Sequence, residues 1–139
     1  MQTFLPYGSD FTAAAKSLDY RRLGKQRVES WQIYRALMNQ SKGWRNHPAV
    51  KMWEGYEAAL VQYGLAMCDE WIARGYKDTM RPRFVELAAL HSWSGLPKWM
   101  DDSKFINSHR SNLIRKMPDV YGELWPDTPN DLPYVWPVQ

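Results

Sequence analysis

One acidic residue lies among basic ones in residues 19–39, a segment with the periodicity of a single helix. Projected at about 100° per residue, its apolar residues share one side and its basic and amide residues share the other. Glu29 falls in the middle of the polar side, surrounded by Arg21, Arg22, Lys25, Gln26 and Gln32. A carboxylate placed there repels the anion that its neighbours attract, which suggests that it performs chemistry on that anion. The alternative is a solvated surface with ion pairs such as Lys25–Glu29.

The basic residues are concentrated in the first third of the chain. The formal net charge is +3, yet residues 1–45 hold eight Lys or Arg against three Asp or Glu. A local basic face is typical of a protein that binds a polyanion, most often nucleic acid. Residues 43–48 and 108–116 add positive and hydrogen-bonding side chains that suit phosphate oxygens. The alternatives are a structural loop histidine at His47 and an ordinary solvated helix at 108–116, and charge alone does not decide between them.

Length and composition predict one domain over residues 1–139, with a core built from large rings, because 45% of the 139 residues are hydrophobic and 14% aromatic. Cys68 is the single cysteine, which excludes an internal disulfide and favours a reducing cytoplasm. The three histidines lack ligand-type spacing, so we expect no metal. No apolar stretch approaches the roughly 20 residues of a membrane span, and no leader-like segment opens the chain. We therefore expect a cytoplasmic protein without a membrane partner.

Helical periodicity and capping residues predict an all-α fold, a compact single-domain helical bundle with an extended Pro-rich C-terminal tail. Residues 54–74 are apolar nearly all round, as expected of a buried central helix. The other predicted elements are a first helix capped by Ser9 or Asp10, the basic helix ending near Asn39, a loop before a helix capped by Asn46, helices over 83–93 and 103–117, and the tail from Trp125.

Several side chains have an expected orientation. On the helix over 103–117 we expect an inner side of Ile106, Arg110, Leu113, Ile114 and Met117, and an outer side of Ser108, His109, Ser111, Asn112, Arg115 and Lys116. Arg27 falls on the apolar side of its helix, which predicts a buried ion pair with an acid of the central helix. Gly24 indicates either a broken helix or a close neighbour. Trp44 either stacks on an exposed base or closes the core under its loop.

Several motifs resemble those of a known family. The spacing from Arg27-Val28-Glu29 to Lys42-Gly43-Trp44-Arg45-Asn46-His47-Pro48, followed by Pro118 and Tyr121, resembles the pyrimidine-dimer DNA glycosylases of the phage endonuclease V type. The chain is more similar still to a bacterial and phage branch of that family, through residues 22–27 and 132–137. The resemblance covers most of the chain for the branch, and about residues 20–53 and 106–121 for the characterised enzymes.

The resemblance implies a small all-α domain that kinks DNA and flips a nucleotide. In that family the N-terminal α-amine attacks the sugar C1′, a Schiff base replaces the base, and a helix glutamate assists. Counting back from Lys42-Gly43 places this glutamate on Glu29. Because Gln2 is bulky, we expect Met1 to be retained and its α-amine to be the nucleophile. Lys25, one turn before Glu29, is the alternative amine.

These observations predict a DNA glycosylase, with abasic-site lyase activity as the finer expectation, acting as a monomer on double-stranded DNA without a cofactor. The predicted catalytic residues are Glu29, Met1 and Lys25. The predicted DNA contacts are Arg21, Arg22, Gln26, Arg45, His47, His109, Asn112, Arg115 and Lys116. Two alternatives stay open: a non-catalytic nucleic-acid-binding module on the same scaffold, and an interaction domain with a Trp-rich surface. The sequence does not specify the base or lesion.

Overall fold

The computed structural model describes residues 1–41 and 43–138, and the regular elements in these ranges are all helical. The all-α prediction is therefore confirmed. In chain order the elements are α1 (Phe11–Ser17), α2 (Tyr20–Leu37), α3 (Pro48–Lys51), α4 (Glu57–Ala73), α5 (Arg81–Ala88), the short 3-10 helix η1 (Lys98–Asp101), α6 (Ser103–Lys116) and α7 (Pro118–Leu124).

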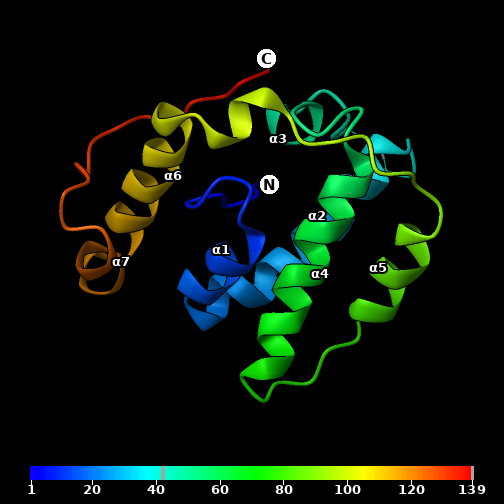
Figure 1. Cartoon of the computed structure of the whole chain (residues 1–139), viewed down its shortest axis with the longest axis horizontal. Helices are drawn as coiled ribbons and strands as arrows, with labels where there is room; N and C mark the ends of the chain where they lie inside the picture. The colour runs from blue at the N-terminus through cyan, green and yellow to red at the C-terminus, as the bar shows by residue number, and fades with distance from the viewer. Residues whose placement is uncertain (42, 139) are drawn as a thin grey trace.

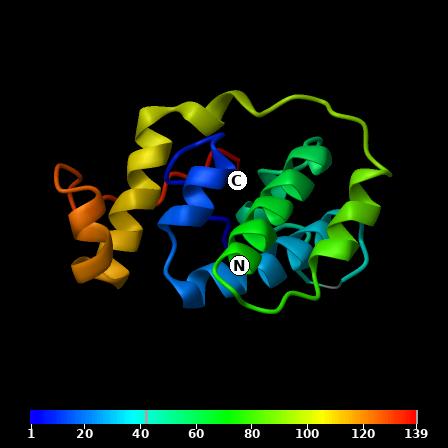
Figure 2. The same ribbon diagram turned by 60° about the horizontal axis from the view of Figure 1, so that its bottom comes forward.

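The helices form two groups with the N-terminal segment between them. Helix α4 packs against α2, α5 and α1, while α6 packs against α7 and η1. In Figure 1 the α6–α7 pair lies on one side and α2, α4 and α5 on the other, with the dark blue N-terminal segment in the middle. Figure 2 shows the same arrangement from another direction. The first residues of the chain are therefore surrounded by helices.

Helix α4 is the predicted buried central helix. Leu60, Val61, Tyr63, Met67 and Cys68 are all fully buried along it. The helix starts later than residue 54, at Glu57. The delay has a backbone reason, because Gly55 has a φ of 85°, which a right-handed helix does not allow.

Helix α2 is continuous through Gly24, so this glycine marks a close neighbour and not a break in the helix. A Cβ atom there would lie 3.0 Å from the ring of Trp71 on α4, closer than most real contacts. The absence of a side chain therefore lets α4 approach α2. The guanidinium of Arg27 lies 4.4 Å from the centre of the same ring. Arg27 also forms the predicted buried ion pair, but its partner Asp78 follows α4 instead of belonging to it.

The predicted outer side of α6 is wrong for four residues, because Ser108, His109, Ser111 and Asn112 are buried. The C-terminal tail covers this side of the helix. The N–H of Leu132 donates to Ser111 Oγ at 2.9 Å, and the N–H of Val135 donates to Ser108 Oγ at 3.2 Å. A covered backbone needs hydrogen-bond partners, and the hydroxyl groups of α6 supply them. Polar side chains here bind backbone instead of facing solvent.

Smaller differences concern helix ends. The side chain of Asp10 accepts a hydrogen bond from Ala13 and caps α1, as predicted. Helix α3 is capped by His47 and not by Asn46, since His47 Nδ1 accepts from the N–H of Ala49 at 3.0 Å. Helix α5 starts at Arg81 and ends at Ala88, earlier at both ends than predicted. None of the helices in the described ranges is long and apolar enough to span a membrane.

Candidate active site at the N-terminus

The start of the chain contacts the helix glutamate that the sequence singles out. The N–H of Gln2 donates to Glu29 Oε2 at 3.3 Å, and both residues are half-buried. The α-amine of Met1 belongs to the residue directly before this N–H, and Met1 lines the same cavity as Glu29. The structure therefore places Met1, which carries the α-amine, and Glu29 on the wall of one cavity.

Gln26 fastens the N-terminal segment to Glu29. Its Nε2 donates to the carbonyl of Gln2 at 2.9 Å and to Glu29 Oε2 at 3.1 Å. Its Oε1 accepts from the N–H of Phe4 at 3.2 Å and from the hydroxyl of Tyr63 at 2.5 Å. Gln26 is 1% exposed and Tyr63 fully buried. Both ends of this amide are thus occupied inside the protein, and Gln26 does not reach solvent as a DNA contact would.

Other helices hold the next residues of the segment. The indole N–H of Trp53 donates to Thr3 Oγ1 at 3.1 Å, and the N–H of Leu5 donates to His109 Nδ1 at 3.0 Å. Arg110 donates to the carbonyl of Pro6 at 2.7 Å. These bonds come from Trp53, which follows α3, and from α6, so the segment is fixed on several sides. Together with the hydrogen bonds of Gln26, these contacts fix the position of the N-terminus.

A cavity of about 740 Å³ opens beside Met1 and Glu29. Four cationic residues line it, namely Arg21, Arg22, Lys25 and Lys116. Three of the four come from the first turns of α2, and Lys116 comes from the last turn of α6. The cavity therefore combines the carboxylates of Glu29 and Asp19, the residue that carries the α-amine and a cationic wall, an arrangement that suits a sugar-phosphate ligand.

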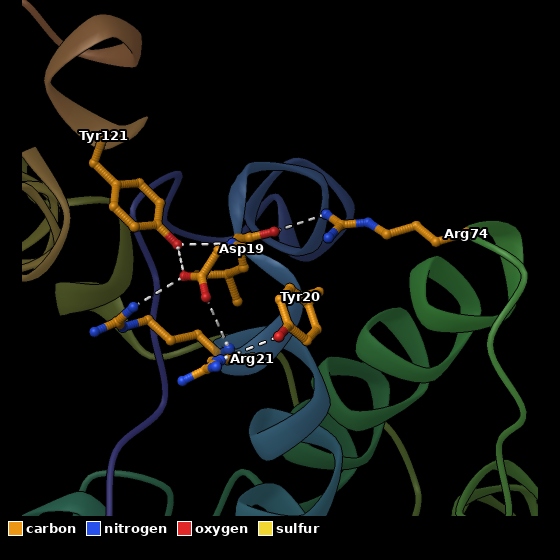
Figure 3. A network of polar contacts seen from close by, with 7 residues as sticks. Asp19, Tyr20, Arg21, Arg74 and Tyr121 are labelled. Atoms are coloured by element: carbon orange, nitrogen blue, oxygen red, sulfur yellow. Dashed lines mark hydrogen bonds and ion pairs between the residues drawn. The ribbon is translucent and has the colours of Figure 1, made fainter. Parts of the chain in front are cut away.

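A network around Asp19 holds one end of this wall (Figure 3). The hydroxyl of Tyr121 on α7 donates to the Asp19 carboxylate and accepts from the N–H of Asp19 at 2.8 Å. Arg22 Nη1 lies 3.1 Å from Asp19 Oδ1. Burial alone would raise the pKa of the Asp19 carboxyl, but the hydrogen bonds from Tyr121 and Arg22 outweigh it and lower that pKa below its ordinary value. The negative charge of Asp19 thus fixes the direction of Arg22.

The remaining predicted DNA contacts do not join this cavity. Arg45 lies in an exposed ion pair with Glu54 at 2.7 Å, and His47 caps α3. Arg115 donates to the carbonyls of Asn130 and Leu132 at 2.7 and 2.8 Å, so it binds the tail. Lys42, part of the loop motif, lies outside the described residues. Of the predicted site residues, the structure gathers Met1, Arg21, Arg22, Lys25, Gln26, Glu29 and Lys116 around the cavity.

His109 and Asn112 are interior residues, 1% and 8% exposed. The His109 ring packs against Phe105 and Tyr134, with ring centres 4.4 and 5.5 Å away. Asn112 Nδ2 donates to the carbonyls of Ser108 and Leu132. Neither side chain is placed to contact DNA, and we leave both out of the proposed interface. The sequence does not predict their interior position, because the pattern of polar residues on a helix is the same whether that side faces solvent or is covered by the C-terminal tail.

The burial of His109 predicts a stability loss in mild acid. Burial lowers the pKa of His109 to about 3, whereas an unfolded histidine has a pKa of about 6.5. Below pH 6.5 the unfolded chain takes up a proton that the folded chain excludes, so stability falls as pH falls. The expected loss is about 2 kcal/mol between pH 7 and pH 5. Urea unfolding of wild type and His109→Asn at both pH values measures it; an equal loss in the variant would contradict the assignment.

The four hydrogen bonds of the Gln26 side chain predict that removing this amide lowers the stability of the fold. In Gln26→Leu the N–H of Phe4 keeps only Tyr63 as partner, while the carbonyl of Gln2 and Glu29 lose a donor. We expect a loss of about 2–4 kcal/mol, since buried polar groups left without partners cost about 1–3 kcal/mol each. Thermal or urea unfolding measures it. The matched control is Gln62→Leu, an exposed glutamine on α4, which should change stability by less than about 0.5 kcal/mol.

No group of three or more His, Cys, Asp or Glu side chains in residues 1–41 and 43–138 is arranged to hold a metal ion. The geometry instead defines a small all-helical domain whose N-terminus, helix glutamate and cationic wall share one cavity.

The family model for pyrimidine dimer DNA glycosylase matches residues 1–83, and the chain belongs to that family. The matched part includes Met1, all of α2 with Glu29, and the central helix α4. Because this is a family of enzymes that act on DNA, DNA is the substrate class. No curated protein matches the chain, and no solved structure does.

Proposed function

We propose that this DNA glycosylase also has abasic-site lyase activity, with the α-amine of Met1 as nucleophile and Glu29 as the catalytic carboxylate. One observation carries the proposal: the N–H of Gln2 lies 3.3 Å from Glu29 Oε2, at the edge of a cavity with four cationic residues. A nucleotide extruded from the duplex would place its sugar between amine and carboxylate.

In the first step the neutral amine of Met1 attacks C1′ of the sugar. The amine lone pair forms the C1′–N bond while the bond from C1′ to the base breaks. The base leaves with the electrons of the broken bond and takes up a proton from water, and Glu29 accepts the proton that the attached amine loses. A carboxylate in the same cavity as the reacting amine is suited to this proton transfer and to stabilising the positive charge that develops.

In the second step the sugar ring opens. The amine nitrogen forms a double bond to C1′ as the C1′–O4′ bond breaks, and Glu29 returns its proton to O4′. The product is a Schiff base. Glu29 then takes a proton from C2′, the electrons of that C–H bond form a C2′=C3′ double bond, and the C3′–O bond breaks so that the 3′ phosphate leaves with the electrons of that bond. Glu29 thus serves in turn the proton transfers at the amine, at O4′ and at C2′.

The cationic wall would bind the phosphates on either side of the extruded nucleotide. Arg21, Lys25 and Lys116 are exposed at the cavity, while Arg22 is held by Asp19. Phosphate contacts of this kind give affinity that falls steeply with salt. We propose double-stranded DNA as the ligand and a monomer as the acting species.

Lys25 is the alternative amine, since it lines the same cavity. Two considerations favour Met1. Model α-amines lose their proton at a pH about two units lower than model lysine amines do, so an N-terminus is more readily a neutral nucleophile. In addition, the hydrogen bonds of Gln26 order the N-terminal segment against Glu29, whereas the side chain of Lys25 is exposed.

The test uses two duplexes, one with a cyclobutane thymine dimer and one with an abasic site. With borohydride present, we expect a covalent protein–DNA adduct on both, and without it a strand break at the lesion. Salt-sensitive binding to both duplexes without adduct or strand break would instead favour the non-catalytic binding module. An unmodified duplex of the same sequence is the control and should give neither product.

A further inference from the structure

The C-terminal tail lies outside the part of the chain that the family model matches, which ends at residue 83. Its exposure alternates along the sequence. Leu132, Tyr134 and Trp136 are half-buried, and the residues between them are exposed. Such an alternation is typical of an extended chain, in which successive side chains point to opposite sides. The three half-buried side chains therefore face the body of the protein.

Helix α6 fixes the tail on both sides of Tyr134. The N–H of Leu132 donates to Ser111 Oγ at 2.9 Å, and the N–H of Val135 donates to Ser108 Oγ at 3.2 Å. Both hydroxyl groups are buried, so these bonds form away from competing water. The backbone around Tyr134 thus has one defined position relative to α6.

Four side chains form a clamp around the N-terminal segment. Gln26 of α2, Trp53, and His109 and Arg110 of α6 each bond to residues 2–6. Of these four side chains, Gln26 alone bonds to the second residue, next to the α-amine. A further contact at the second residue would therefore have a direct effect on where the amine lies.

Tyr134 makes such a contact. Burial raises the pKa of its hydroxyl, and a hydrogen bond from the side chain of Gln2 offsets part of this rise. The side-chain oxygen of Gln2 accepts from the N–H of Thr3 at 3.0 Å, so both ends of this amide are bound. The Tyr134 ring also packs edge-on against His109, with ring centres 5.5 Å apart, and His109 holds the N–H of Leu5. Tyr134 thus supports the N-terminal segment at two places.

Trp136 extends the tail towards the α-amine. Its ring packs edge-on against His47, with ring centres 6.1 Å apart, and lies 5.7 Å from the ring of Tyr134. Burial lowers the pKa of His47, and the positive charge of the N-terminus lowers that pKa further. The N-terminus is therefore near enough to His47 to act on it, and the tail lies against the same histidine.

We propose that the C-terminal tail positions the α-amine, with Tyr134 as the positioning residue. Its hydroxyl holds Gln2, and Gln2 in turn places Met1 in the cavity that Glu29 lines. This inference rests on the proposed function, because it concerns the amine that reacts there. Tyr134 acts through Gln2 and is not itself a catalytic residue. The bulky second residue thus gains a role, since its amide ties the start of the chain to its end.

Two substitutions, Tyr134→Phe and Gln2→Leu, remove the hydrogen bond from opposite sides. Leucine is bulky, so Met1 should be retained in both variants, and an intact mass verifies this. Each should lower the rate constant of borohydride trapping on the abasic duplex about fivefold or more, because a displaced reacting group can cost up to about 10²-fold. The dissociation constant for the duplex and the fraction of protein that is trapped should stay unchanged.

The double variant should trap no more slowly than Gln2→Leu alone, as expected of two residues that act through one contact. The matched control is Tyr56→Phe, which removes a hydroxyl from a half-buried tyrosine at the N-cap of α4 and should leave the rate constant unchanged. An unchanged rate constant in Tyr134→Phe, or a lower trapped fraction at an unchanged rate constant, would overturn the inference.

A second measurement does not depend on catalysis. NMR relaxation gives order parameters for the N–H groups of Gln2 and Thr3, which should be near the rigid value of about 0.85 in wild type and fall towards about 0.6 in Tyr134→Phe. If they fall but wild type forms no adduct, the lyase mechanism falls and the placement of the N-terminus by the tail stands. If wild type forms an adduct while Tyr134→Phe changes neither trapping nor order parameters, the mechanism stands and the positioning role falls.

Discussion

Replacing Glu29 with Gln is expected to slow Schiff-base formation on an abasic duplex by about 10²- to 10⁴-fold, the usual contribution of a positioned general acid–base group. The amide is nearly isosteric and its oxygen can still accept from the N–H of Gln2, so the fold and the N-terminal clamp should persist. What is lost is the ability to accept and return a proton. Borohydride trapping under single-turnover conditions, sampled over time, measures the rate.

The same substitution should tighten DNA binding. Glu29 is a negative charge in a cavity with four cationic residues, so its neutralisation removes a repulsion towards phosphate. Slower chemistry with equal or tighter binding separates a catalytic role from a structural one. The matched control is Glu86→Gln on the exposed side of α5, which should alter neither quantity. An unchanged trapping rate in Glu29→Gln would show that this carboxylate is not catalytic.

Blocking the α-amine is expected to have the largest effect of all. Acetylation of the Met1 nitrogen delocalises the attacking lone pair into an amide, which is not nucleophilic, so adduct formation should fall to background while DNA binding persists. Adding one glycine before Met1 tests position instead of chemistry, since it moves the amine by about 3.8 Å away from the clamp. We expect this extended form to lose most of its trapping rate. Normal trapping by the acetylated protein would exclude Met1 as the nucleophile.

Helical periodicity was sufficient to locate the most informative element. The polar side of α2 could be identified from spacing alone, because Arg21, Lys25 and Glu29 recur one turn apart and face the same way. Helix α4 could be identified from its continuous apolar character. These features depend on short-range sequence patterns, and the structure agrees with them.

The partners of polar side chains could not be predicted in the same way. Gln26 lies on the polar side of α2, and the pattern is the same whether an amide faces DNA or the backbone of the chain's own first residues. Its contacts with Gln2 and Phe4 span 24 and 22 positions, and the contact of Leu5 with His109 spans 104. No local periodicity encodes such pairings. They arise because the buried N-terminal segment must satisfy its N–H and C=O groups.

The Asp19–Tyr121 pair illustrates the same point. Tyr121 belongs to a motif of the family resemblance, yet its contact with the cap of α2 depends on how α7 packs, 102 positions away. In the structure Asp19 is the N-cap of α2, and its side chain accepts from the N–H of Arg22. Only the fold reveals that this cap also pairs with Arg22 and thereby positions part of the cationic wall.

The central claim is that the amine at the start of the chain, next to Glu29, forms the covalent bond to DNA. Its most direct test is to reduce the adduct on an abasic duplex with borohydride, digest the protein with trypsin and locate the modified peptide by mass spectrometry. An intact mass first verifies that the preparation begins at Met1. The account predicts the modification on residues 1–16, at the α-amine. Modification on residues 23–27, at Lys25, or the absence of any adduct would contradict it.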